Sequence, residues 1–153
     1  MNRSRYVTRS LDATDRAIIA ALTEDGRMTF KQLAKKIGLS SPSIRARILK
    51  LEDAGAIRGY TIVIDPNAFG LATSAFVRMN ATPGRIQKLE QMLDESAEVV
   101  QAYRVTGEDS FLAKFVVCDA NELQAVVNRF QTFASADTAI ILSTTVAQRL
   151  PRL

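Results

Sequence analysis

The side chains that most often carry out catalysis or bind metal ions are nearly absent from this sequence. Its 153 residues include one cysteine, Cys118, and no histidine. A Ser-His-Asp triad, a Cys-His pair and a zinc site built from cysteine and histidine are therefore excluded by composition, and the lone cysteine has no intramolecular disulfide partner. We expect Cys118 to be a small buried hydrophobic residue at the end of a strand.

The acidic residues give no catalytic arrangement either. Glu108/Asp109 and Asp94/Glu95 are adjacent pairs, and neighbouring residues do not face one another as an acid–base couple must. The sequence contains no G-x-G-x-x-G motif and no P-loop, so it signals no nucleotide site. These observations predict a protein that is not an enzyme, with no catalytic residues, no cofactor and no metal.

Cations, in contrast, are concentrated in the first part of the chain. Residues 1–64 hold 12 Lys and Arg against 6 Asp and Glu, a balance of +6, whereas residues 65–153 hold 8 against 10, a balance of −2. This asymmetry indicates a module that binds a polyanion, joined to a part with another task. The alternative is a basic surface that is merely solvated.

The elements that must position these cations begin with two predicted helices. Asp12 and Asp15 have the spacing of a capping box for the first helix, and Thr29 and Gln32 have it for the second. Gly38 then supplies the left-handed residue that ends the second helix. Both helix starts are therefore marked in the sequence.

A third helix is predicted after a very short turn. Ser41 is expected to cap it and Pro42 to occupy its first helical position. Ile44, Ile48 and Leu51 recur at the spacing of one buried stripe. Two short helices joined by a three- to four-residue turn containing glycine form a helix-turn-helix.

The free face of the third helix carries small polar and cationic residues, which suit insertion into the major groove of DNA. Residues 1–10 show no periodicity and are predicted to be a flexible basic arm. The predicted base contacts are Ser43, Ala46, Arg47 and Lys50. The predicted phosphate contacts are Arg27, Lys31, Arg45, the arm residues Arg3, Arg5 and Arg9, and the start of the third helix at Ser41 and Ser43.

The rest of the chain has the pattern of a second domain. After a strand over residues 57–64, further strands are expected over residues 71–81, 99–105, 111–117 and 138–148, with a helix after the first and the third of these four. The order β-α-β-β-α-β is ferredoxin-like, with both helices on one face of the sheet. The other face, bearing either Ala75, Val77 and Met79 or the set that includes Phe76, needs a cover, and we expect a second copy of the chain to supply it.

Several short stretches follow one another in a specific order and spacing. They are Leu11-Asp12 with Asp15, Gly26-Arg27, Leu33-Ala34, Gly38-Leu39-Ser40, Arg47-Ile48, Leu51-Glu52, Gly55-Ala56-Ile57, Gly59-Tyr60, Asp65-Pro66, Phe69-Gly70, Val105-Thr106-Gly107 and Thr138-Ala139-Ile140-Ile141-Leu142. Over nearly its full length the chain resembles the Lrp/AsnC family, the feast/famine transcription regulators of bacteria and archaea.

The resemblance implies an α+β chain in four parts. A basic arm at 1–10 precedes a winged helix-turn-helix DNA-binding domain at 11–57. A strand linker at 58–70 pairs with the same strand of a partner. A ferredoxin-like βαββαβ domain at 71–153 binds an effector and oligomerises. Members of the family form dimers that associate into tetramers or octamers, and many respond to an amino acid.

The resemblance also places the effector near one loop, and this sequence departs from the family there. Many members have Gly-x-aromatic-Asp, where this chain has Gly107, Glu108, Asp109 and Ser110. The hydroxyls of Ser110 and Thr138 could hold the carboxylate of an amino acid, and Glu108 or Asp109 its ammonium group. The alternative is an ordinary hairpin turn, because glycine, aspartate and serine are turn formers.

We therefore expect a sequence-specific transcription regulator that binds double-stranded DNA and responds to a small effector, such as an amino acid, through changes in assembly. The alternative is an architectural chromatin protein that binds DNA with little sequence preference. No segment approaches the ~18 consecutive apolar residues of a membrane span, and none resembles a signal peptide. The expected location is the cytoplasm, in association with the nucleoid.

Overall fold

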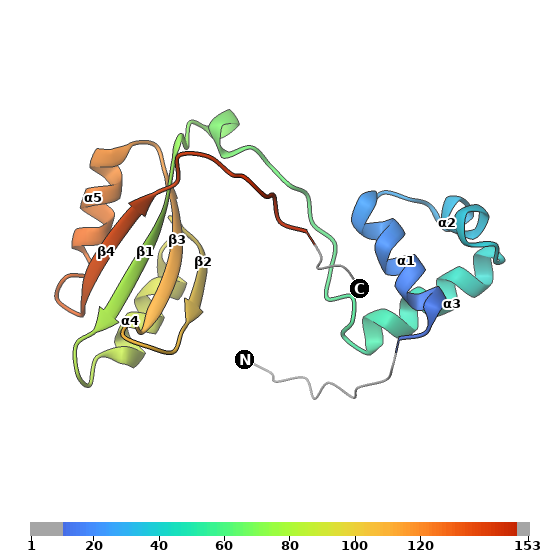
Figure 1. The fold of residues 1–153 in the computed structure, drawn as a ribbon, viewed down its shortest axis with the longest axis horizontal. Coiled ribbons are helices and arrows are strands. Elements are labelled where there is room, and N and C mark those ends of the chain that lie inside the picture. Colours follow the sequence, from blue (N-terminus) through green and yellow to red (C-terminus); the bar gives the residue numbers. More distant parts are fainter. Residues whose placement is uncertain (1–10, 150–153) are drawn as a thin grey trace. The chain divides into compact units, whose positions relative to one another are not determined.

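The structure is a computed structural model, and it describes residues 11–149 (Figure 1). Contacts within the chain divide it into two compact units. One unit ends at Val63 and also includes the C-terminal end from Ala147, and the other spans Ile64–Val146. None of the described helices is long and apolar enough to cross a membrane.

Three helices form the first unit. They are α1 (Ala13–Glu24), α2 (Phe30–Ile37) and α3 (Ser41–Asp53). Each helix turns its apolar stripe toward one core, as the spacing of these residues predicts. The buried residues of this core are Ile18, Ala21, Leu33, Ala34, Ile44, Ile48 and Leu51.

The capping boxes predicted for α1 and α2 are both present. The Asp12 carboxylate accepts a hydrogen bond of 2.7 Å from the backbone N–H of Asp15, and the Asp15 carboxylate accepts one of 3.4 Å from the backbone N–H of Asp12. Thr29 and Gln32 exchange the corresponding bonds at the start of α2. These bonds satisfy N–H groups that have no partner inside the helix.

Helix α3 begins one residue earlier than the sequence suggests. Its N-cap is Ser40 and not Ser41, and the Ser40 hydroxyl accepts a hydrogen bond of 3.3 Å from the backbone N–H of Ser43. Pro42 is consequently the second helical residue, which is still in the first turn, where a missing N–H removes no helical hydrogen bond. Two consecutive serines are equally good caps, so local preference could not choose between them.

The strand predicted over residues 57–64 is not formed in the single chain. The segment Ile57–Ile64 has no regular secondary structure, and no described strand pairs with it. A strand needs a neighbour that accepts its N–H groups and donates to its carbonyls. Its apolar side chains are left in solvent, with Ile62 80% and Val63 100% exposed. The alternating pattern therefore marks a segment that is able to pair but has no strand partner in the described part of the chain.

The second unit has the predicted βαββαβ order, preceded by a short 3-10 helix at Pro66–Phe69. All neighbouring strands are antiparallel, and their order across the sheet is β2-β3-β1-β4 (Figure 1). The elements are β1 (Thr73–Ala81), α4 (Ile86–Glu95), β2 (Val99–Arg104), β3 (Phe111–Val117), α5 (Ala120–Asn128) and β4 (Ala134–Ile140).

The last strand lies earlier than predicted. β4 spans Ala134–Ile140 in place of residues 138–148, and its ends lie opposite Ala81 and Ala75 of β1. The first half of β4 has few of the branched and aromatic residues that favour strands. Its conformation is set by pairing with β1, which a reading of local propensity does not include.

The two helices of this unit cover one face of the sheet. Ala75, Val77 and Met79 of β1 are fully buried in the core beneath α4 and α5. Phe115 of β3 meets Phe130 edge-to-face at 5.9 Å between ring centroids. Of the two sets left open by the sequence, the one that includes Phe76 therefore faces away from the helices.

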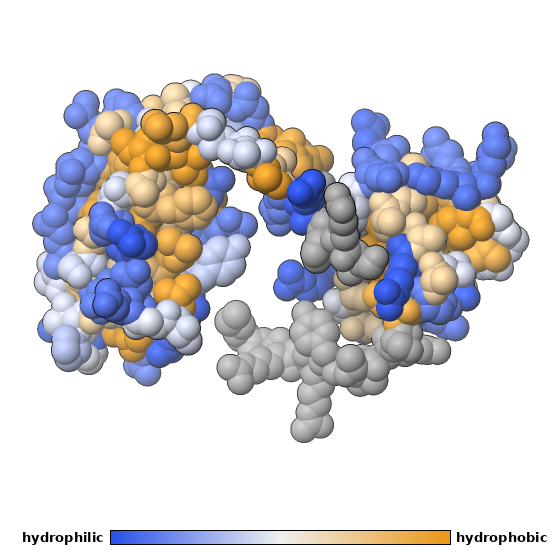
Figure 2. Space-filling view, viewed as in Figure 1, coloured by the Kyte–Doolittle hydropathy of each residue, from blue (hydrophilic) through white to orange (hydrophobic). Residues whose placement is uncertain are grey.

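The opposite face of the sheet carries exposed apolar side chains. Phe76 is 38% and Tyr103 52% exposed. On this side of the sheet, Figure 2 shows hydrophobic surface interrupted by hydrophilic residues. One interruption is an ion pair between Arg78 and Asp137, which lie opposite one another on β1 and β4. This face is called the open sheet face below.

The expectation that Cys118 is buried is wrong. Its side chain is exposed, and the thiol donates a hydrogen bond of 2.8 Å to the Glu122 carboxylate. This hydrogen bond and the nearby negative charge raise the pKa of the Cys118 thiol above its usual value. The thiol therefore stays protonated and weakly nucleophilic.

Candidate nucleic-acid interface and ligand loop

A three-residue turn sets the direction in which α3 leaves α2. Gly38 has a φ of 81°, a left-handed conformation that is costly for residues with a Cβ atom. The backbone N–H groups of Gly38 and Leu39 both donate to the carbonyl of Ala34, at 2.9 and 3.1 Å. The end of α2 and the start of α3 are thus both closed by hydrogen bonds, which gives the helix-turn-helix a defined geometry.

Helix α3 presents its polar side to solvent. Ile44 and Ile48 are buried, whereas three of the predicted base contacts, Ser43, Ala46 and Lys50, are exposed. The small side chains of Ser43 and Ala46 allow a groove edge to approach the helix closely, and the lysine adds a long cationic donor. This is the composition that insertion into a major groove requires.

The start of α3 gathers hydroxyl groups. The Oγ atoms of Ser40 and Ser43 lie 2.8 Å apart, and the predicted phosphate contact Ser41 is half-buried beside them. Ser40 was missed as a site residue because the sequence prediction placed the cap at Ser41, although the two serines are equally good caps. The unpaired N–H groups of a helix N-terminus favour an anion such as phosphate.

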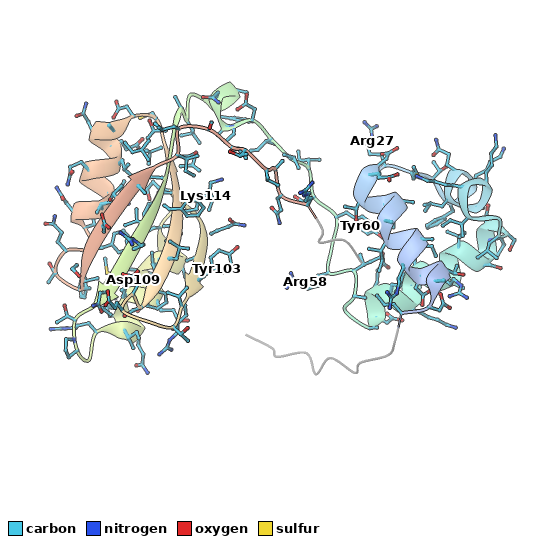
Figure 3. The ribbon with its side chains drawn as sticks, viewed as in Figure 1. Arg27, Arg58, Tyr60, Tyr103, Asp109 and Lys114 are labelled. Atoms are coloured by element: carbon cyan, nitrogen blue, oxygen red, sulfur yellow. The ribbon has the colours of Figure 1, made fainter. Side chains whose placement is uncertain are left out.

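Exposed cations without an acidic partner surround this helix. Among residues 11–149, no carboxylate lies within ion-pair distance of four predicted contacts, which are Arg27, Lys31, Arg45 and Lys50. Arg27 lies in the turn that joins α1 to α2 (Figure 3). Lys35 is also exposed and unpaired in this part of the chain but was not singled out from the sequence, whereas its neighbour Lys36 pairs with Glu24 at 2.6 Å.

Arg47 is placed differently from the other predicted base contacts. Its Nη1 atom donates hydrogen bonds of 2.7 Å to both Asp12 and Asp15 at the start of α1. Bonding to Asp12 and then to Asp15 raises the pKa of Arg47 above its usual value. The backbone N–H of Asp15, followed by the Arg47 guanidinium, lowers the pKa of Asp12. The positive charge of Arg47 is therefore paired with two carboxylates of the protein itself, unlike the charges of the other predicted contacts that the structure describes.

The predicted phosphate contacts of the arm, Arg3, Arg5 and Arg9, lie outside the described residues.

A hydrogen bond joins α3 to the segment that follows it. Glu52 of α3 accepts this bond, of 2.9 Å, from the hydroxyl of Tyr60, which is labelled in Figure 3. The bond ties the start of the extended segment to that helix.

The predicted ligand loop connects β2 to β3. Gly107 has a φ of 114°, and the loop closes where the backbone N–H of Val105 donates to the Ser110 carbonyl at 3.1 Å. Ser110 is bound to β1, because its N–H donates to the Met79 carbonyl and its hydroxyl accepts from the N–H of Ala81. Glu108 is exposed and Asp109 half-buried. Asp109 is labelled in Figure 3. The loop is thus anchored by its serine and offers its carboxylates outward.

Thr138 does not join this loop within one chain. It lies on β4 opposite Val77, whereas Ser110 bonds to Met79 and Ala81 from the other side of β1. Two strand spacings separate them, on the order of 10 Å. Thr138 instead lines an open groove of about 640 Å³ between α5 and β4.

The geometry defines a helix-turn-helix unit with a cationic outer surface, followed by an αβ unit with four antiparallel strands. Within residues 11–149, no cluster of three or more acidic or cysteine side chains is suited to a metal ion. The AsnC-type helix-turn-helix domain matches residues 11–52, and the Lrp/AsnC ligand binding domain matches residues 74–151. The chain belongs to the Lrp/AsnC family of transcriptional regulators.

Known members of the family match along nearly their whole length. LrpA of Mycobacterium tuberculosis, an HTH-type transcriptional regulator, is 34% identical over 143 residues, covering 92% of this chain and 95% of that protein. The structure of E. coli AsnC covers 91% of this chain and 97% of its own, with 29% identity and a TM-score of 0.82. A Neisseria meningitidis transcriptional regulator in complex with L-Met covers 93% and 97%, with 26% identity and a TM-score of 0.87.

Proposed function

We propose that this protein is a sequence-specific DNA-binding regulator that reads the major groove with α3. The observation that carries the proposal is the outward face of this helix, where Ser43, Ala46 and Lys50 are exposed above a fully buried stripe. These residues supply the base contacts. Arg27, Lys31, Arg45 and the serines at the start of α3 contact phosphates, as do the cations of residues 1–10.

The working form is a symmetric dimer. Phe76 and Tyr103 make the open sheet face partly apolar, and a second copy of the same face can cover it. Residues 58–64 expose backbone groups without a strand partner among residues 11–149, together with apolar side chains, and the same segment of a second chain can pair with them. A dimer carries two α3 helices, so its sites are near-palindromes whose halves lie one or more helical turns apart.

The second unit binds a small effector. A relative with 26% identity has a structure in complex with L-Met, and an amino acid is the ligand class that we propose here. Glu108 and Asp109 supply the partner for an ammonium group, and Gly107 allows close approach of backbone N–H groups to a carboxylate. Because Thr138 lies apart from this loop within one chain, it contributes where two chains, or two dimers, meet.

The effector acts by coupling assembly to DNA affinity. A ligand that binds at a contact between dimers favours one assembly, and the assembly decides how many α3 helices engage DNA together. The proposal places the protein on chromosomal DNA in the cytoplasm, as a dimer or as a tetramer or octamer of such dimers. It has no catalytic role.

Selection of bound sequences from a random DNA pool tests the proposal. We expect a near-palindromic motif, bound at least 10³-fold more tightly than unrelated DNA. A ratio near one would instead support an architectural chromatin protein. An amino-acid panel is added in sedimentation and DNA-binding experiments, where an effector must shift both quantities together. If none does, the second unit serves assembly alone.

A further inference from the structure

Arg47 closes a hydrogen-bonded ring with the start of α1. All four carboxylate oxygens of Asp12 and Asp15 are engaged, two by backbone N–H groups of the capping box and two by the Arg47 guanidinium. Arg47 therefore does not simply approach an acidic patch. It completes the cap of α1 from the middle of another helix.

Only one half of this ring is well buried. The Asp15 side chain is 20% exposed and that of Arg47 34%, whereas the Asp12 side chain is 52% exposed. In the surface pair of Lys36 and Glu24 both side chains are more open than Arg47, at 47% and 69%. Arg47 also precedes Ile48 and lies one turn before Leu51, both of which are buried in the core.

The position of the ring along the chain gives it a functional consequence. Asp12 comes directly after Leu11 and the arm residues, which include three arginines. The bond from Arg47 to Asp12 therefore fixes the point at which the arm joins the domain relative to α3. Loss of Arg47 would release this point and would leave two carboxylates without a cation beside them.

We propose that Arg47 is a positioning residue, which fixes α3 and the origin of the basic arm relative to one another and reads no base pair itself. This inference rests on the proposed DNA-binding function. It removes Arg47 from the base contacts expected from the sequence and leaves Ser43, Ala46 and Lys50 in that role.

Hydrogen exchange on the full-length protein without DNA tests the structural half of the inference. Arg47→Met keeps the stem and removes the charge. It should increase exchange both in the first turn of α1 and in α3, and Arg47→Lys should restore part of the protection. Arg45→Met is the matched control, since Arg45 is exposed and unpaired within residues 11–149. If Arg47→Met and the control give the same exchange, the inference is overturned.

DNA binding by Arg47→Met and Arg47→Lys tests the functional half of the inference. Affinities are measured for the selected site and for a set of sites with one base pair changed at a time. Arg47→Met should weaken every site by the same factor, about tenfold, and leave the preferred base at each position unchanged. A residue that reads a base would relax preference at one position, by a factor of roughly 5 to 150. That outcome, or a smaller salt dependence, would return Arg47 to the DNA contacts.

The two hypotheses fail in different ways. A wild-type protein that shows no salt-dependent binding to double-stranded DNA would overturn the proposed function. The exchange measurement contains no DNA and would still decide whether Arg47 holds α1 to α3. If Arg47→Met does not fold, Asp12→Asn removes the same bond from the other side, and it should loosen the same two segments.

Discussion

Replacing Arg27 with glutamine removes one proposed phosphate contact without disturbing the fold. The side chain has no ion-pair partner within residues 11–149. Its backbone N–H, which donates to the Asp25 carboxylate at 2.9 Å, is retained in the variant. We therefore expect thermal stability to stay the same, so that any change in DNA binding reflects the lost cation.

The size of the effect follows from counterion release. Each phosphate neutralised by the protein contributes about 0.9 to the slope of log K against log salt concentration. A dimer contains two copies of Arg27, so the slope should become less steep by about 1.8. Between about 50 and 200 mM salt, the variant should therefore lose roughly tenfold less affinity than the wild type does.

Fluorescence anisotropy with labelled DNA measures this slope over a series of salt concentrations. Lys88→Gln is the charge-matched control, because Lys88 lies on α4 of the second unit, where it donates a hydrogen bond to Gln91 and has no ion-pair partner among the described residues. Its slope should equal that of the wild type. If Arg27→Gln and Lys88→Gln change the slope equally, Arg27 senses only overall charge and contacts no phosphate.

Three further predictions concern the core, the assembly and acid stability. Phe130→Ala removes a fully buried ring from the second unit and should cost about 3–5 kcal/mol of unfolding free energy, measured by denaturant titration. Phe76→Glu places a charge on the open sheet face and should yield monomers in sedimentation without lowering helix content; a variant that stays dimeric would place the dimer contact elsewhere. The pKa of Asp12 is lowered in the folded state by Asp15 and Arg47, so the unfolded chain binds a proton more readily. The stability from Asp12 should therefore be complete above about pH 4 and be lost as pH falls through its folded pKa. Asp12→Asn should be less stable than the wild type at pH 7, and the difference should shrink in acid.

The helix starts could be predicted from the sequence because their causes are local. The Thr29 and Gln32 side chains bond to backbone three residues away, so the whole capping box lies within one short stretch of sequence. The same holds for Gly38, whose conformation ends α2. Ser40 and Ser41 are equally good N-caps for α3, and the predicted cap, Ser41, was wrong by one residue.

The strands were harder to predict because a strand depends on a partner that lies far away in the sequence or, as we propose for residues 57–64, in a second copy of the chain. β4 is held by β1, more than fifty residues earlier, and its own sequence gives little indication of where it begins. Residues 57–64 have the pattern of a strand but no strand partner among residues 11–149. Pairing, and not propensity, decides both cases.

In the candidate site, too, features with a local cause could be predicted from the sequence, and features set by distant residues could not. The exposure of Ser43, Ala46 and Lys50 follows from the helical period and could be predicted. The pairing of Arg47 could not, since its two partners are 35 and 32 residues away. The helical period puts Arg47 at the edge of the buried stripe formed by Ile44, Ile48 and Leu51, and from there a side chain can turn toward a neighbouring helix or toward DNA.

The unpaired stretch around Val63 also affects the fate of a newly synthesised chain. Its apolar residues and free backbone groups can join any other unpaired strand, including strands of unfolded proteins. In the proposed dimer the same segment of a second chain pairs with this stretch. The hazard of aggregation is therefore greatest between release from the ribosome and the formation of that dimer. A high local concentration of newly made chains shortens that interval, whereas a low concentration prolongs it.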